Sequence, residues 1–300
     1  MTLRGFRETG ASFGFVVRTI VFGRPEDQEI VRPVAVATGT DGRIAIADIG
    51  SKCVHLFIPK EQRYFKVFTA DSVELASPVG VAFDDESRLY VSDSILNRIL
   101  VFDGQGTYLF SINPGAAPRR LTGLAYDRQK KTLYSVDTLG NRIYALTAKG
   151  DIAFSFGERG TGKGQFNYPT HIYRSASGLL YITDTMNFRI QVFDSSGRFV
   201  SAFGQHGDGS GDFAMPKGVA SDSDGIVYVV DSLFDNIQLF SIYGEFLLTL
   251  GSRGSAQGEF WLPSGIFIDE SDKLYVCDTF NQRVQIFQIV PHKNEMKTGD

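Results

Sequence analysis

Apolar and polar positions form a motif that recurs along the chain. The clearest copy is LYVSDSILNRILVF, residues 89–102. It recurs as LYSVDTLGNRIYAL, LYITDTMNFRIQVF, VYVVDSLFDNIQLF and LYVCDTFNQRVQIF, and a weaker copy, IAIADIGSKCVHLF, precedes them all. In each copy a short apolar run, a polar turn and a second apolar run follow one another, which is typical of two strands joined by a turn.

An aspartate closes the first run of every copy and marks the period of the repeat. The six aspartates are Asp48, Asp93, Asp137, Asp184, Asp231 and Asp278, at spacings of 45, 44, 47, 47 and 47 residues. This period is that of one four-stranded propeller blade. We therefore predict an all-β fold, a six-bladed β-propeller of four-stranded antiparallel blades.

The start of each repeat predicts the innermost strand. Five repeats begin with a proline and the third with Leu121; the prolines are Pro33, Pro78, Pro169, Pro216 and Pro263. Two positions later stands Ala35, Gly80, Gly123, Gly218 or Gly265, with His171 as the exception. We expect the inner strand after the proline, the motif above as the second and third strands, and an outer strand such as RFVSAFG, residues 198–204.

The two ends of the chain complement each other. Repeat six stops after its third strand at about Val290, whereas residues 16–25, VVRTIVFGRP, have the pattern of a fourth strand. We predict that this N-terminal strand completes the last blade and closes the ring, which removes an open sheet edge. The expected division is a lead-in of residues 1–13, one propeller of residues 14–290 and a tail of residues 291–300.

Composition narrows the classes of function. The chain has 300 residues, 43% of them hydrophobic, and a net charge of −4, which disfavours nucleic acid as a partner. No apolar run approaches the ~20 residues of a membrane span, and residues 1–14 lack the apolar stretch of a secretory signal. Cys53 and Cys277 belong to blades that closure makes neighbours, but they occupy different strands, so two buried free thiols are expected rather than a disulfide.

The P-x-G-[IV] start, the L-Y-V-x-D middle and the N-x-R-[IV]-x-[VI]-F end together resemble the NHL repeat, over about residues 14–290. The resemblance implies a six-bladed ring around a central channel. Residues 169–194 and 213–240 are also similar to bacterial exported NHL proteins, often lipoproteins, that are encoded beside multihaem cytochromes. That similarity implies a periplasmic, extracellular or lipid-anchored protein whose partner is another protein, a multihaem cytochrome or its assembly.

The sequence gives little support for catalysis. We expect the repeated aspartates to cap turns, and Arg98, Arg142, Arg189 and Arg283 to pair with carboxylates or carbonyls. NHL-type amidating lyases need several histidines around a central zinc, and here only His171 falls on an inner strand. No haem-attachment motif occurs. We assign no catalytic residue, no metal site and no cofactor.

The candidate site is where the repeats depart from their pattern. The turns after the second strands and the connections between blades four to six carry Tyr168, Met186, Phe188, Phe213, Phe234, Trp261 and Phe280. These side chains either form a contact patch or fold back over the blades. Blade four also departs at His171, Tyr173 and Arg174. The predicted binding residues are Tyr168, His171, Arg174, Phe188, Arg189, Lys217, Phe234, Trp261 and Phe280.

Three functions follow from these observations. The leading one is a non-enzymatic protein-binding scaffold, a monomer that serves as an accessory of an exported bacterial assembly. The similarity to proteins encoded beside multihaem cytochromes implies an electron-transfer assembly. The alternative is a metal-dependent lyase or lactonase that acts in the channel. The second alternative is an RNA-binding NHL domain, which the acidic net charge disfavours.

Overall fold

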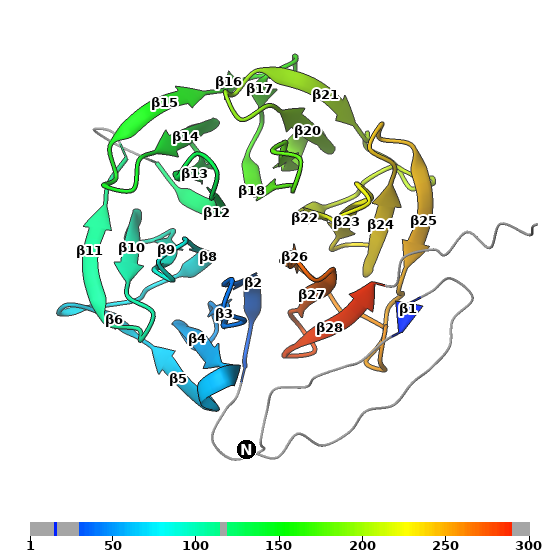
Figure 1. Ribbon diagram of the computed structural model, residues 1–300. Helices are drawn as coiled ribbons and strands as arrows, with labels where there is room; N and C mark the ends of the chain where they lie inside the picture. The colour runs from blue at the N-terminus through cyan, green and yellow to red at the C-terminus, as the bar shows by residue number, and fades with distance from the viewer. Residues whose placement is uncertain (1–14, 17–29, 115–118, 290–300) are drawn as a thin grey trace, which may run out of the picture.

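Six four-stranded antiparallel sheets stand around a central axis like the blades of a propeller (Figure 1). The computed structural model describes residues 30–114 and 119–289, and the backbone of residues 15–16. In chain order the first three blades are β2 (Pro33–Thr38), β3 (Ile44–Asp48), β4 (Cys53–Ile58) and β5 (Arg63–Val67); β8 (Pro78–Phe83), β9 (Leu89–Asp93), β10 (Arg98–Phe102) and β11 (Tyr108–Ile112); and β12 (Leu121–Asp127), β13 (Thr132–Asp137), β14 (Arg142–Leu146) and β15 (Ile152–Phe156).

The next two blades are β18 (Pro169–Arg174), β19 (Leu180–Asp184), β20 (Arg189–Phe193) and β21 (Phe199–Phe203); and β22 (Pro216–Ser221), β23 (Val227–Asp231), β24 (Asn236–Phe240) and β25 (Phe246–Leu250). The sixth blade combines β26 (Ile266–Ile268), β27 (Lys273–Asp278) and β28 (Arg283–Ile289) with β1 (Phe15–Val16). The predicted fold class is therefore confirmed.

The N-terminal strand occupies the place of the missing fourth strand. Phe15 pairs with Ile289 and Val16 with Gln288, antiparallel. This pairing confirms that the ring is closed by the N-terminus, as the sequence predicts. The remainder of the expected strand, up to residue 25, lies outside the described residues.

The core consists of six apolar clusters, each shared by two neighbouring blades. The second strand is buried over its whole length in blades one, two, four and five, and over all but its first residue in blades three and six, because it lies between two other sheets. The outer strands β21 and β25 instead alternate between half-buried and exposed residues, since one of their faces meets solvent. One cluster joins Ile46 of blade one to Tyr275 and Ile286 of blade six. Apolar side chains thus pack between the first and last blades, where the ring closes.

Close approach of the inner strands explains the small residue near the start of five of the six repeats. A Cβ added at Gly80 would lie 2.3 Å from the carbonyl oxygen of Thr122, and one at Gly265 would lie 2.4 Å from that of Val34. Each of these carbonyls belongs to the inner strand of the next blade, Val34 being reached across the closure. A larger residue at these positions would push neighbouring blades apart.

The chain direction gives the ring two distinct faces. We call the upper face the one that carries the turns after the second strands and the connections between blades, and the lower face the one that carries the other turns. The connections contain the hairpin β6 (Thr69–Ala70) and β7 (Val73–Glu74) and the parallel pair β16 (Glu158–Arg159) and β17 (Gln165–Phe166). Two short 3-10 helices, η1 (Pro59–Glu61) and η2 (Thr185–Asn187), occur in turns. No helix in the described part of the chain is long and apolar enough to cross a membrane.

Candidate functional site

The repeated aspartates are structural, as the sequence predicts. The Asp93 carboxylate accepts hydrogen bonds from the amides of Ala76 and Ser77 at 2.7 and 2.9 Å, and from those of Ile95 and Leu96 at 3.0 and 2.9 Å. It thereby caps its own turn and also fixes the connection from the preceding blade. Several hydrogen bonds of this kind fix a carboxylate in place.

Blades four and six add a side-chain network to this cap. Asp278 accepts from the Nδ2 of Asn281, from the Nε of Arg283 at 2.7 Å and from the Nε2 of Gln285 at 3.1 Å. The same three bonds reach Asp184 from Asn187, Arg189 and Gln191. The expected arginine–aspartate pairs are thus confirmed for Arg189 and Arg283, whereas Arg98 and Arg142 form no ion pair with a described residue.

Arg189 is consequently held within the fold. Besides Asp184, its guanidinium donates to the carbonyl oxygens of Gly162 and Gln165 at 2.8 and 2.9 Å. These bonds tie the third strand of blade four to the connection that precedes the blade. The sequence analysis names Arg189 as a candidate for binding a partner. In the structure its guanidinium holds this connection in place.

The connections before blades four, five and six are built alike. In each, a glutamine of the third strand donates from Nε2 to a carbonyl and accepts an amide at Oε1; Gln238 does so with Asp212 at 2.7 Å and Gly211 at 3.0 Å. Gln191 and Gln285 repeat the arrangement. A phenylalanine of each connection is fully buried; the three are Phe166, Phe213 and Phe260. The placement of Phe213 in an exposed patch is therefore wrong, because its ring packs 5.6 Å from that of Phe240 inside the blade.

Phe188 and Phe234 are half-buried rather than fully exposed. The Phe188 ring packs edge-on against His206, with ring centroids 4.4 Å apart, and joins the apolar cluster between blades four and five. Its backbone has φ +55°, a conformation that bulky residues rarely adopt. Of the two alternatives that the sequence leaves open, Phe188 therefore follows the second: its ring folds back over the blade and is only partly exposed.

A ring of exposed apolar side chains surrounds the upper face. It is formed by the second residue after each repeated aspartate in blades two to six, together with two aromatic residues of the connections. Its members are Ile95, Leu139, Met186, Leu233, Phe280, Tyr168 and Trp261, with exposed fractions between 38% and 70%. We call this set the upper apolar ring. Sequence reasoning found the aromatic members and Met186 but missed the aliphatic ones, although their recurrence at one position of five repeats is visible in the motif.

Trp261 and Phe280 form the centre of a cationic stack where blades six and one meet. Their ring centroids are 5.6 Å apart, the Arg253 guanidinium lies 5.6 Å from the Trp261 ring, and that of Arg32 lies 5.7 Å from the Phe280 ring. Such cation–π contacts hold the arginines against the aromatic surface. The predicted site residues Trp261 and Phe280 therefore do lie together, in contact with two arginines.

Tyr168 is held in an unusual backbone conformation. Its φ is +54° and its amide donates to Oδ1 of Asn141, in the turn of blade three, at 2.9 Å. The side chain is nevertheless 43% exposed. Leu262 repeats this arrangement before blade six, with φ +45° and an amide that donates to Oδ1 of Asp235, so the backbone conformation belongs to the connection between blades.

The channel holds a cavity of about 1250 Å³, lined by the inner strands and by turns of the lower face. Tyr173 projects across it: its hydroxyl shares its single proton between the carbonyl oxygens of Ser221 in blade five and Ile268 in blade six, at 3.0 and 3.1 Å. Burial raises the pKa of this hydroxyl. Tyr173 therefore joins three blades and is a structural residue of the channel wall.

His171 is the third residue of strand β18 and Arg174 is its last, and both line the channel cavity. His171 is near the upper mouth, with Nδ1 2.9 Å from Oγ1 of Thr170. Arg174 pairs with Leu180 at the lower end of the blade and contacts Asp127 and Gln129, at 3.3 and 3.1 Å. The grouping of Arg174 with the aromatic residues in one site therefore does not hold, because a six-residue strand separates its position from the upper face.

The upper mouth is cationic. Lys217 follows the first residue of β22, and Arg120 directly precedes β12. Burial, and secondarily the nearby Arg120, lowers the pKa of Lys217; burial, and secondarily Lys217, lowers the pKa of His171 to about 3. The imidazole is therefore neutral at ordinary pH.

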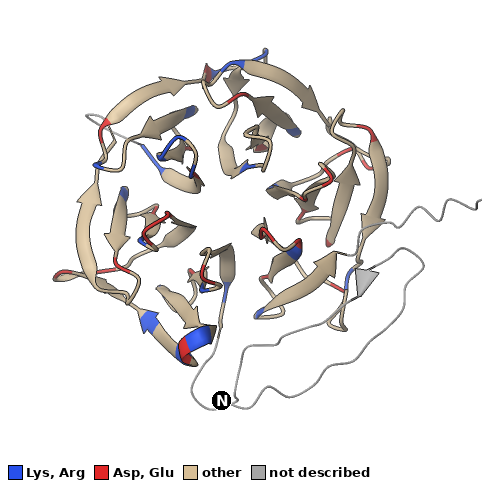
Figure 2. Ribbon diagram, in the orientation of Figure 1, with Lys and Arg blue, Asp and Glu red and all other residues tan. Residues whose placement is uncertain are grey.

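The lower mouth has mixed charge with an acidic excess (Figure 2). The cavity is lined there by Asp41, Asp222, Asp269, Glu270 and Asp272, with Lys60, Arg128, Arg174 and Lys273 among them. Within the described ranges, no group of three or more His, Cys, Asp or Glu side chains is arranged to hold a metal ion. Cys53 and Cys277 are buried free thiols, as expected.

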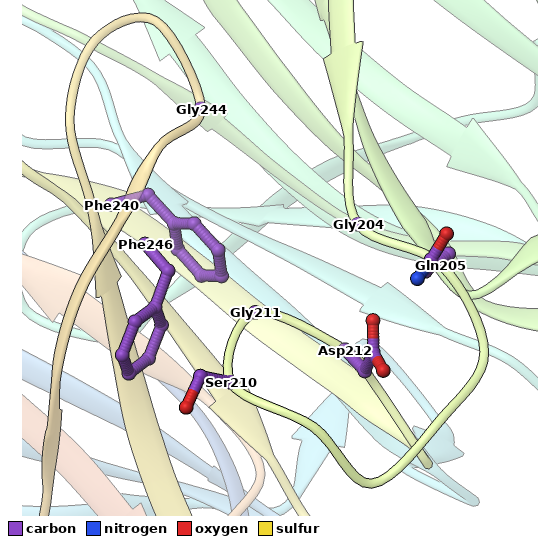
Figure 3. A pocket seen from close by; sticks show the side chains of 8 residues that line it. All are labelled: Gly204, Gln205, Ser210, Gly211, Asp212, Phe240, Gly244 and Phe246. Carbon is purple, nitrogen blue, oxygen red and sulfur yellow. The ribbon is translucent and has the colours of Figure 1, made fainter.

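A second hollow, of about 270 Å³, lies beside the connection between blades four and five (Figure 3). The rings of Phe240 and Phe246 lie on one side and Gln205 and Asp212 on the other. The hollow is separate from the channel, and its wall contains one charged side chain, Asp212. It offers little chemistry of its own.

The family model described as a 6-bladed beta-propeller matches residues 173–232 and 220–290. No curated protein matches the sequence significantly. Among solved structures, a streptogramin B lyase has a TM-score of 0.65 at 14% identity, with 92% of this chain and 98% of that chain covered.

Two further neighbours have other functions. A chain of hydrazine synthase from Kuenenia stuttgartiensis has a TM-score of 0.61 at 13% identity, covering 90% of this chain and 99% of that one. An auxiliary nutrient binding protein from Bacteroides thetaiotaomicron has a TM-score of 0.68 at 12% identity, covering 86% and 69%. At such identities the likeness concerns the fold alone. By its repeats, its sheets, its family match and these neighbours, the chain is a six-bladed β-propeller, consistent with the resemblance of its repeats to NHL repeats.

Proposed function

We propose that this propeller is a non-enzymatic scaffold that binds another protein through its upper face. The observation that carries the proposal is the upper apolar ring. Exposed apolar side chains gathered on one face are typical of protein contact sites, and Trp and Tyr are among the residues enriched there.

The fold itself does not require these side chains. Blade one has Gly50 where the other blades have the exposed apolar residue, and its turn is capped by Asp48 in the same way, through the amides of Gly50 and Ser51. A large apolar residue at this position therefore adds exposed surface without being needed for the turn. Contact with a partner accounts for that surface.

The finer proposal places the scaffold in an exported bacterial assembly, with a multihaem cytochrome or its assembly as the partner. It is supported by the similarity of residues 169–194 and 213–240 to exported NHL proteins encoded beside such cytochromes. The solved neighbours, which include a nutrient-binding protein and a chain of hydrazine synthase, are compatible with a binding role for this fold.

The test is capture of a partner from the cells that produce the protein, followed by identification by mass spectrometry. The bait is compared with a variant that combines Met186→Ser, Trp261→Ser and Phe280→Ser. We expect the unchanged protein to retain a defined partner and the variant to lose it while its melting temperature stays close to that of the parent.

The matched control is Ile242→Ser with Tyr243→Ser, which removes two exposed apolar side chains from one turn of the lower face. This control should retain the partner. If the triple variant also retains it, or if the lower-face control loses it, the upper face is not the binding surface. Leu233→Asp, a single change, serves as a second probe should the triple variant be unstable.

A further inference from the structure

Positively charged residues without an acidic partner in the described part of the chain stand at the starts of three inner strands, where the channel opens to the upper face. They come from three inner strands or the residues just before them: Arg32 in blade one, Arg119 and Arg120 in blade three, and Lys217 in blade five. The side chains of these four residues form no ion pair with any acidic side chain of residues 30–114 or 119–289.

The electrostatic environment shows that these groups influence one another. The pKa of Lys217 is lowered by burial and by Arg120, and that of His171 is lowered by burial and by Lys217. Three blades thus turn positively charged or donor groups toward a common region. An anion placed there would meet several donors and relieve their mutual repulsion.

The cationic mouth and the upper apolar ring are one continuous surface. Arg32 links them, because its guanidinium stacks on Phe280, a member of the ring. The acidic residues of the channel lie at the other mouth, where the cavity is lined by Asp41, Asp222 and Asp269 among others. A partner that approaches the upper face therefore meets apolar side chains around a positively charged centre.

We infer that the upper mouth binds carboxylates of an acidic, apolar segment of the partner protein. This inference rests on the proposed function and adds the chemistry of the partner. Charge complementarity selects an acidic segment over a basic or neutral one, and the aliphatic members of the ring, such as Ile95 and Leu139, suit apolar side chains beside the acidic ones. RNA, which would also meet the cations, has no apolar side chains for these aliphatic residues to pack against.

The experiment is selection of a random dodecapeptide display library on the full chain, followed by binding of a synthetic copy of the most enriched peptide. We expect enriched peptides to combine Asp or Glu with large apolar residues. The synthetic peptide should lose about tenfold in affinity when its acidic residues become Asn or Gln. It should lose a similar factor on a protein variant with Arg120→Gln and Lys217→Gln.

The matched control is Lys130→Gln with Lys131→Gln, which removes two positive charges from an exposed turn of the lower face. It should bind the peptide as the parent does. The inference is overturned if no acidic peptide is enriched, if the Arg120/Lys217 variant binds normally, or if a poly(U) oligonucleotide binds the mouth more tightly than the peptide. If the mouth variant still captures the natural partner and the upper-ring variant does not, the scaffold proposal stands and this inference alone falls.

Discussion

The two faces of the ring are made from the same kind of turn yet present different surfaces. On the lower face an aspartate caps the turn after the first strand: Asp84 accepts the amides of Glu86 and Arg88, both at 2.9 Å. On the upper face the repeated aspartates do the same for the turn after the second strand. Large exposed apolar residues stand in five upper turns, whereas in the described lower turns they are Ile242 and Tyr243, both in one turn.

The comparison distinguishes the hydrogen bonds that stabilise a turn from the side chains that the turn exposes to solvent. Because the carboxylate supplies the hydrogen bonds in both cases, polar or small residues suffice for stability at the exposed positions. The proposed scaffold function assigns the exposed apolar residues of the upper face to contact with a partner. The same distinction applies to the charged side chains. Arg189 and Arg283 form ion pairs with aspartates of their own blades, whereas Lys217 forms no ion pair with a described residue.

The largest effect is expected from removing an aromatic ring beneath the upper face. Phe213→Ala should lower the free energy of unfolding by about 3–5 kcal/mol, because the ring is fully buried against Phe240. Denaturant unfolding measures this. Trp261→Ala is the comparison, and a loss as large as that of Phe213→Ala would show that the upper apolar ring belongs to the core.

A smaller loss is expected from Gln238→Leu. Leu100 occupies the same position of blade two, so the side chain fits a blade, but the amide of Gly211 and the carbonyl of Asp212 lose their partner. An unpaired buried backbone group costs about 1–3 kcal/mol. Hydrogen exchange of the Gly211 amide should accelerate selectively; unchanged exchange would mean that the glutamine does not hold the connection.

Because of His171, the free energy of unfolding should depend on pH in the acid range. The pKa of His171 is about 3 in the folded protein and 6.5 ordinarily, so the unfolded chain takes up the proton first as the pH falls. The stability that the neutral imidazole contributes is complete above about pH 6.5 and is lost progressively toward about pH 3. His171→Gln should therefore lose less stability over this interval in thermal melts, and an identical acid response would contradict the low pKa.

The smallest effect is expected for members of the upper apolar ring whose side chains are more than half exposed. Met186→Ser and Leu233→Ser should each change the free energy of unfolding by less than about 0.5 kcal/mol, as exposed surface substitutions do. Chemical denaturation of the single variants tests this. A loss above about 1 kcal/mol would mean that the side chains support the blade tops after all.

Repeat length, proline and glycine positions and the incomplete last repeat were enough to derive six blades, their strand order and closure by β1. These features are local and periodic, so each copy in the sequence reinforces the others. The capping role of the aspartates was derivable for the same reason, because turn chemistry depends on a few adjacent residues.

Which of the singled-out side chains reach solvent was decided only in three dimensions. Phe213 and Trp261 both lie in connections before a blade, yet one is buried and the other exposed. Arg174 ends its strand at the lower mouth of the channel, whereas His171 stands in the middle of the same strand. Arg189 is bound by a carboxylate, whereas Lys217 forms no ion pair with a described residue. Each outcome depends on contacts with a neighbouring blade or with a distant part of the same blade, and residue type and spacing within one repeat carry no record of those contacts.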